Sequence, residues 1–215
     1  MKIITFLAVC VVGFTAMFSC KQNEYSCDPD VEEWTKTHLE EFQAAEREKI
    51  VSLPLKRQMA VYNGLTPEAK SKLWKSKLAI LMNDDSFAND EKVLFTLLSD
   101  IVTPRLFDES SDNVKLIDDY EVLSRRIFEG KQDKYAYALC TWMTEDEYQR
   151  SWIAEEPVLT KINGGEVEPE IACVCRHDIG CLASGGGNCN NQLECTSKEK
   201  GCGFLGKYSC DGLCE

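Results

Sequence analysis

The chain has 215 residues, which allows one or two domains, and its apolar fraction of 44% is ordinary for a globular protein. Its net charge of −12 argues against a nucleic-acid partner, because the phosphate backbone attracts lysine and arginine. The same charge disfavours simple electrostatic adsorption to anionic lipid.

Residues 1–19 have the pattern of an export signal, with a lysine at the start and then an apolar run that is short for a membrane-spanning helix. Ser19 stands directly before Cys20, and a small residue before a cysteine resembles a bacterial lipobox. We therefore expect lipidation of Cys20 and an exported, membrane-anchored lipoprotein of the bacterial cell envelope, on the periplasmic face or at the cell surface. The alternative is ordinary secretion with cleavage nearby.

The twelve cysteines fit this address. Cys10 would leave with the signal peptide and Cys20 would carry the lipid, so an even number would remain. Eight of these lie near the C-terminus, and the other two are Cys27, in a short polar tether at residues 20–28, and Cys140. Export places them in an oxidising compartment, so we predict a disulfide between Cys27 and Cys140. The alternative is two unpaired thiols.

Helix-start signals recur through residues 29–153. Asp28-Pro29 and Thr66-Pro67 each place a capping residue before a proline in the first turn. The spacing of Thr144 and Glu147 is that of a capping box and indicates a break in the last helix. Further starts lie at Pro54, at Asn89 or Asp90, between Ser111 and Asn113, and before Tyr135. Five or six short amphipathic helices with brief links predict an all-α domain from 29 to 153.

Apolar spacing assigns a core face to each of these helices. We expect Leu97 on the fourth helix, and Leu116 and Leu123 on the fifth, to point inward. Gly64 is expected to end the second helix in the left-handed conformation. His38 lies on the stripe of the first helix and is more simply a core residue than a functional one. The tryptophans are most simply core anchors, with a ligand-binding aromatic cluster as the alternative: Trp34, Trp74, Trp142 and Trp152.

Residues 154–172 form the predicted linker. Asn163-Gly164-Gly165 lies between two short apolar-rich runs, and Asn-Gly favours a type I′ turn, so we expect a small hairpin or an extended linker. The alternative is a processing site, because the leaders of some bacteriocins are cut after a double glycine. Cleavage there would release Glu166–Glu215.

Residues 173–215 form a cysteine-rich module with few large apolar side chains. A stretch of about forty residues with so little apolar surface cannot build a sufficient core, so we expect disulfides to hold a small, loop-dominated fold. Metal binding is the weaker alternative, because the module has no C-x-x-C pair and His177 is its one histidine, so we expect no metal and no cofactor. The connectivity stays open among eight cysteines: Cys173, Cys175, Cys181, Cys189, Cys195, Cys202, Cys210 and Cys214.

Three large apolar residues stand near the end of the module: Phe204, Leu205 and Tyr208. Binding residues concentrate on loops that a rigid scaffold positions, so these three are candidate contacts with a protein or glycan receptor. Alternatively, they form a miniature core within the module.

The module begins with Cys173-x-Cys175 and continues through Cys181, Cys189 and Cys195. It ends with Gly201-Cys202-Gly203 and Tyr208-Ser209-Cys210-Asp211-Gly212-Leu213-Cys214. This pattern is similar to the C-terminus of the bacteriocin fulvocin C-related proteins. The run Leu65-Thr66-Pro67-Glu68, followed by Leu73-Trp74, resembles the helical part of the same family. The resemblance implies an exported protein with a bacteriocin-like module, and it supplies no catalytic residues.

Two functions are consistent with these features. The first is a bacteriocin fulvocin C-like exported lipoprotein, in which the module is the antagonistic or receptor-binding part. The second is a cell-envelope interaction lipoprotein with no antibacterial activity. The module has four basic and five acidic residues, whereas membrane-disrupting peptides are usually cationic, so we expect a specific receptor. The chain lacks the H-E-x-x-H, G-x-S-x-G and C-x-x-C-H motifs, and we expect no enzyme.

Overall fold

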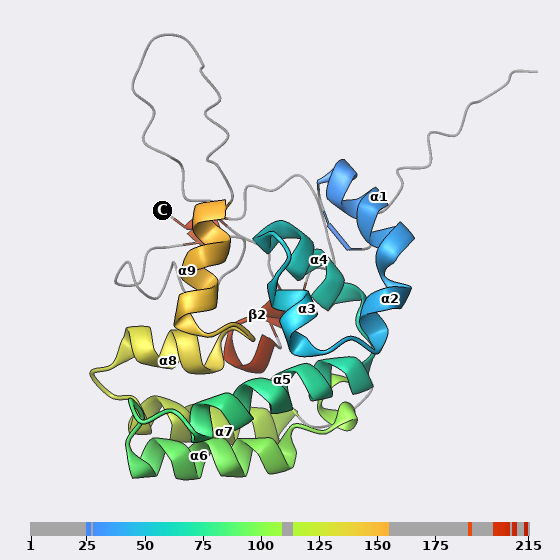
Figure 1. Cartoon of the computed structure of the whole chain (residues 1–215). Helices are drawn as coiled ribbons and strands as arrows, with labels where there is room; N and C mark the ends of the chain where they lie inside the picture. Colours follow the sequence, from blue (N-terminus) through green and yellow to red (C-terminus); the bar gives the residue numbers. More distant parts are fainter. Residues whose placement is uncertain are drawn as a thin grey trace, which may run out of the picture.

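The computed structural model describes residues 25–26, 28–108, 114–154, 189–190, 200–206, 208–209 and 213–214 (Figure 1). The predictions for the signal peptide, Cys20, Cys27, the linker beyond Ala154 and most of the module fall outside these residues. The described α-helices are α1 (Pro29–His38), α2 (Glu40–Gln43), α3 (Arg47–Val51), α4 (Leu55–Gly64), α5 (Pro67–Met82), α6 (Asn89–Ile101), α7 (Val114–Ile127), α8 (Gln132–Leu139) and α9 (Glu145–Ala154), with a 3₁₀-helix, η1 (Pro104–Phe107).

These helices confirm the predicted all-α fold for the described part of the chain before residue 155. They number nine within that part, where five or six were expected. The first predicted helix is divided into α1, α2 and α3, and the last into α8 and α9.

Helix starts follow the capping residues of the sequence. The Asp28 side chain accepts hydrogen bonds from the backbone N–H groups of Asp30 and Val31 at the start of α1. Thr66 accepts one from Ala69 N at 3.2 Å at the start of α5. The predicted capping box is also present. The Glu147 carboxylate accepts from Thr144 N at 2.7 Å, and Glu147 N donates to Thr144 Oγ1 at 3.4 Å.

Gly64 does not have the predicted left-handed conformation. It is the last residue of α4, and the positive-φ glycines among the described residues are Gly130, Gly203 and Gly206. The reason for a glycine here is close packing. A Cβ at this position would lie 2.5 Å from Leu39 Cδ2. The glycine therefore lets the chain after α1 approach the end of α4.

The predicted core faces of α6 and α7 are right at Leu94 and Leu98, which are completely buried, but wrong at three other positions. Leu97, Leu116 and Leu123 were expected inside, but their side chains are 40%, 41% and 38% exposed. Phe95 is buried on α6 and Ile117 on α7 instead. Phe95 packs edge-on against Phe87 of the loop before α6, with ring centroids 5.0 Å apart.

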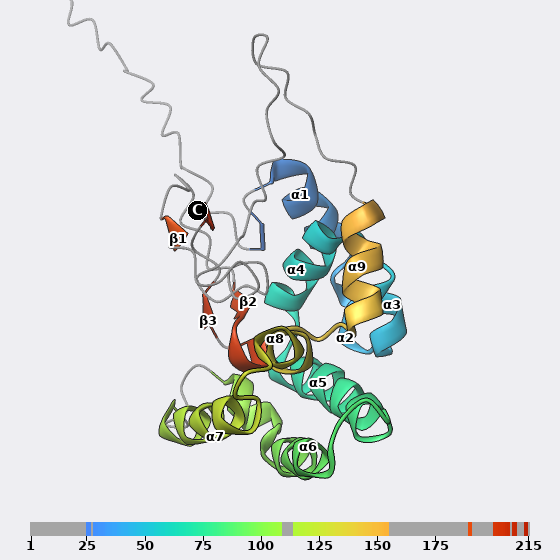
Figure 2. The ribbon, with the colours of Figure 1, turned by 90° about the vertical axis from the view of Figure 1, so that its left-hand side faces the viewer.

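Helix α5 is the centre of the helical domain. Figures 1 and 2 both place it between α1–α4 on one side and α6 and α7 on the other. Its inner residues Trp74 and Leu78 are completely buried, and Ser71 fixes it to the end of α6 through a 2.8 Å hydrogen bond to Val102 O. No helix among the described residues is both long enough and apolar enough to cross a membrane.

The described residues of the cysteine-rich segment form two short antiparallel ladders. β1 (Cys189–Asn190) pairs with β4 (Leu213–Cys214), and the register places Cys189 opposite Cys214. β2 (Lys200–Cys202) pairs with β3 (Tyr208–Ser209). Between β2 and β3 lies a single 3₁₀ turn, η2 (Phe204–Gly206), which leads directly into the candidate site.

Candidate functional site

The turn at Gly203–Gly206 is inserted into the core of the helical domain. The Phe204 side chain is 1% exposed and that of Leu205 is 0% exposed. Both belong to the same buried cluster as Tyr62, Trp74 and Trp142 of the helical domain. Figure 2 shows the turn lying beside α8, below β2 and β3. The Gly203–Gly206 turn, near the end of the chain, is therefore a structural part of the helical domain.

Tyr62 of α4 contacts the turn, and two tryptophans contact the Tyr62 side chain in turn: Trp74 of α5 and Trp142 of the α8–α9 loop. We call these three aromatic residues the Tyr62 socket. The rings of Tyr62 and Trp142 stack with centroids 4.2 Å apart. Trp74 Nε1 donates to Tyr62 Oη at 3.1 Å, and Tyr62 Oη donates to Leu205 O at 3.4 Å. Burial raises the pKa of the Tyr62 hydroxyl. The hydroxyl therefore stays protonated and keeps its donor for the turn.

The backbone of the turn has a conformation that most residues avoid. Gly203 and Gly206 have φ values of 65° and 64°, and Leu205 has a φ of 52°, although it is not a glycine. A left-handed residue with a branched side chain costs on the order of 1–2 kcal/mol. Burial of Leu205 offsets this cost. The second glycine is also needed for space, because a Cβ at Gly206 would lie 2.5 Å from Tyr62 Oη.

The prediction that Phe204 and Leu205 are exposed partner contacts is wrong. Neither forms a miniature core within the module alone, because both pack into the helical domain. The physical reason is that two large apolar side chains are stabilised more by an existing core than by a short segment with few apolar neighbours. The side chain of Tyr208 lies outside the described residues.

The loop between α8 and α9, which carries Trp142, is held from inside by Lys77. This lysine of α5 is completely buried, and its Nζ donates to the backbone carbonyls of Tyr137, Thr141 and Met143, at 3.0 Å for Thr141. Burial, followed by the charge of Arg47, lowers the pKa of Lys77 to about 7. Three acceptors match the three donors of an ammonium group. Lys77 therefore fixes the shape of the loop at the cost of a buried charge.

Arg47 holds the same loop from the other side. Its buried guanidinium donates from Nε to Trp142 O at 3.1 Å and pairs with the carboxylate of Glu147. Burial works against ionisation of Glu147, but the hydrogen bond from Thr144 N and the charge of Arg47 leave its pKa lowered. Gln58 accepts from Trp142 Nε1 at 3.2 Å. These contacts fix the indole that stacks on Tyr62.

Cys140 lies at the end of α8 as a free, buried thiol, and burial raises its pKa to about 12. The predicted disulfide between Cys27 and Cys140 is therefore not formed in the structure, and Cys27 itself is outside the described residues. Tyr25 is fixed to the end of α4, since its carbonyl oxygen accepts from Asn63 Nδ2 at 2.9 Å.

His38 is half-buried rather than in the core. Its ring stacks on Trp34 with centroids 4.7 Å apart, and the Arg57 guanidinium lies 4.5 Å from the centroid of the same indole. The expected role of Trp74 and Trp142 as core anchors is confirmed by their burial. Trp34 is partly buried against the core, and the side chain of Trp152 is outside the described residues.

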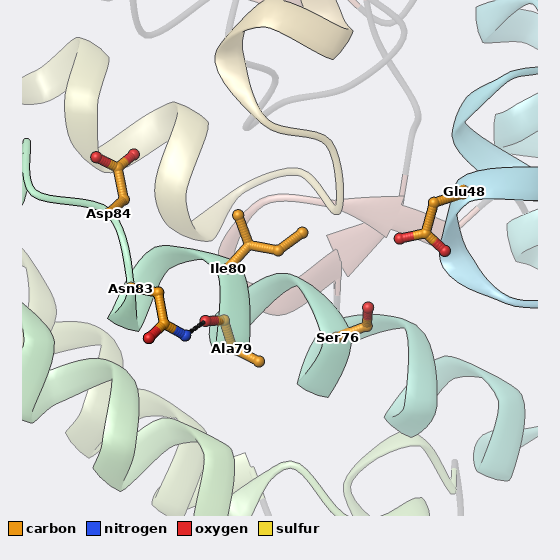
Figure 3. A pocket seen from close by; sticks show the side chains of 6 residues that line it. All are labelled: Glu48, Ser76, Ala79, Ile80, Asn83 and Asp84. Carbon is orange, nitrogen blue, oxygen red and sulfur yellow. Dashed lines mark hydrogen bonds between the residues drawn. The ribbon is translucent and has the colours of Figure 1, made fainter.

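An open groove of about 630 Å³ runs along the outer side of α5 (Figure 3). Ile80 lies in its middle, with Glu48 at one end and Asp84 at the other. Asn83 Nδ2 donates to Ala79 O at 2.7 Å within its wall. The groove is lined by six residues, which include no histidine, cysteine or lysine: Glu48, Ser76, Ala79, Ile80, Asn83 and Asp84.

Nothing in the sequence distinguishes Lys77 and Arg47 as central residues. Lys77 and Arg47 look like ordinary surface charges in a helical pattern, and only their burial distinguishes them. The described residues contain no group of three or more His, Cys, Asp or Glu side chains that could hold a metal ion. Searches of protein-family models, of curated proteins and of solved structures found nothing that matches this chain.

Proposed function

We propose that this chain is a lipid-anchored protein of the bacterial cell envelope that binds a protein or glycan partner through its cysteine-rich C-terminal module. Cys20 carries the anchor in this proposal, and disulfides hold the small loop-dominated module. The helical domain is the base on which the module is fixed. The insertion of the Gly203–Gly206 turn into the helical domain is the observation that carries the proposal.

The turn favours a fixed module over a released one. Burying a large apolar side chain stabilises by roughly 1.5–3 kcal/mol, so withdrawal of Phe204 and Leu205 would cost about 3–6 kcal/mol before any refolding of the socket. It would also break the hydrogen bond from the buried Tyr62 hydroxyl to Leu205 O. A segment designed for release would gain nothing from such a contact.

The resemblance to bacteriocin fulvocin C-related proteins supports the competing function. In that case the module is the antagonistic part, and cleavage after Gly164-Gly165 would set Glu166–Glu215 free. Since the module has nearly balanced charge, its activity would depend on a specific receptor. Both functions require export, and they differ in whether the module leaves the helical domain.

Expression of the chain with a C-terminal epitope tag in a diderm bacterium separates the two functions. We expect the full-length protein in the membrane fraction, and we expect Cys20→Ala to move it to the soluble fraction. Accumulation of the tagged Glu166–Glu215 fragment in the medium, together with inhibition of related strains by the purified, oxidised fragment, would contradict the proposal. The partner is then sought by cross-linking on intact cells, with Phe204→Ser as a variant whose module is detached from its base.

A further inference from the structure

We propose that the Tyr62 socket is a binding site in its own right for the Gly203–Gly206 turn, so that a chain cut between residues 155 and 188 remains one two-chain protein. This inference rests on the contact that also supports the proposed function, but it needs no envelope partner.

The contacts between turn and socket are non-covalent and distant in sequence. Tyr62 and Leu205 are 143 residues apart, and their hydrogen bond joins the first half of the chain to its last residues. Phe204 and Leu205 lie in the same buried cluster as the socket. β2, directly before the turn, also lies against α4, the helix that carries Tyr62. A break in the chain between α9 and β1 would remove none of these contacts.

The socket selects a particular kind of peptide. The ligand has an aromatic and an aliphatic residue between two glycines, with the aliphatic residue and both glycines in the left-handed region. The position of Gly206 excludes any side chain, because Tyr62 Oη occupies the space of a Cβ. The hydroxyl of Tyr62 accepts a hydrogen bond from Trp74 Nε1 and donates one to the backbone carbonyl of Leu205. The recognised class is therefore a Gly-aromatic-aliphatic-Gly turn.

The side chains that hold the socket in place belong to the helical domain and not to the turn. Lys77 holds α8 and the α8–α9 loop through three backbone carbonyls, and Arg47 holds Trp142 through its carbonyl oxygen. Both side chains belong to the helical domain, and none of these hydrogen bonds involves a residue of the turn. A site whose side chains are already ordered loses less entropy on binding, which favours affinity. Cutting the chain lowers the effective concentration of the turn from the millimolar range to that of the protein itself.

The test uses the full chain with a recognition sequence for a site-specific protease inserted after Gly165. The background carries Cys20→Ser, Cys27→Ser and Cys140→Ala, so that no cysteine of the mature chain remains on the N-terminal side of the cut. Any association after cleavage is then non-covalent, which a non-reducing denaturing gel confirms. Near-UV circular dichroism before cleavage shows whether each variant has folded. The cut protein is passed through a gel-filtration column at micromolar concentration.

We expect the two pieces to elute together at the volume of the uncut chain. Phe204→Ala should raise their dissociation constant about 10- to 100-fold, as expected for the loss of most of one buried aromatic side chain. Gly206→Ala keeps every side chain but places a methyl group against Tyr62 Oη, and it should also weaken the association. Val93→Ala, at a 59% exposed position on α6, is the matched control and should change nothing.

Separate elution of the two pieces from the unsubstituted background would overturn the proposal. The proposal would also be overturned if the pieces of the Phe204→Ala and Gly206→Ala variants stayed together as tightly as those of the unsubstituted background. Another surface would then hold the segment. Neither result depends on an envelope partner. The envelope proposal can therefore fail in the cell while this one holds, or the reverse.

Discussion

Replacement of Phe204 by alanine should destabilise the helical domain, although residue 204 lies 50 residues beyond the end of α9. The Phe204 side chain is 1% exposed and contacts the main core cluster. A buried Phe→Ala change costs about 3–5 kcal/mol, through lost burial and the cavity that it leaves. For a protein of this size, each kcal/mol lowers the melting temperature by about 2–4 °C, so we expect a decrease of about 6–20 °C.

Urea unfolding of the oxidised chain, followed by tryptophan fluorescence, measures this effect. Trp74 and Trp142 are buried in the helical domain, so their emission reports the unfolding of the domain that receives the turn. Val93→Ala, at an exposed site, serves as the control and should remain within about 0.5 kcal/mol of the wild-type stability. If Phe204→Ala also changed the free energy of unfolding by less than about 0.5 kcal/mol, the turn would not be part of the helical core.

Three further predictions concern the socket and its supports. Gly206→Ala should destabilise the domain by about 1–3 kcal/mol, because Gly206 has a φ of 64° and an added Cβ would meet Tyr62 Oη. The loss of stability should be smaller in a Tyr62→Phe background, and equal losses in a double-mutant cycle would contradict the contact. The free energy of unfolding of the wild type should rise between pH 7 and 9, because the lowered pKa of Lys77 means that the unfolded state binds more protons there than the folded state. Lys77→Met should remove this rise. If urea titrations gave the same dependence of stability on pH in this variant, Lys77 would not be its cause. The Cys140 thiol should react with an alkylating reagent only after unfolding, since it is buried and burial raises its pKa to about 12. Rapid labelling of the native protein at that position, detected by mass spectrometry, would show that the thiol is accessible in the folded state.

Local signals in the sequence accounted well for where helices begin. Asp28, Thr66 and the pair Thr144–Glu147 cap α1, α5 and α9 as their types and spacing predict. Capping depends on a few consecutive residues, so it can be inferred without knowledge of the tertiary structure. The all-α class of the described helical part follows from the same short-range information.

Contacts between distant segments could not be predicted in the same way. Gly64 follows an asparagine and suggests a left-handed cap, but its actual role depends on Leu39, which lies between α1 and α2. Phe204 and Leu205 were assigned to a separate module because their neighbours in sequence are cysteines and glycines. The socket that buries them is formed by residues more than sixty positions earlier, and no periodicity in the sequence links the two. The burial of Lys77 likewise depends on how distant segments pack together, and its position on the helix does not predict it.

The central claim is that the end of the chain is built into the helical domain, and nuclear Overhauser effects in the oxidised full-length protein test it most directly. A Cβ placed on Gly206 would lie 3.3 Å from Tyr62 Cε1, so the α protons of Gly206 should give strong cross-peaks to the ring protons of Tyr62. Assigned resonances for both residues without such cross-peaks, and with rapid solvent exchange of the Gly206 amide, would contradict the claim.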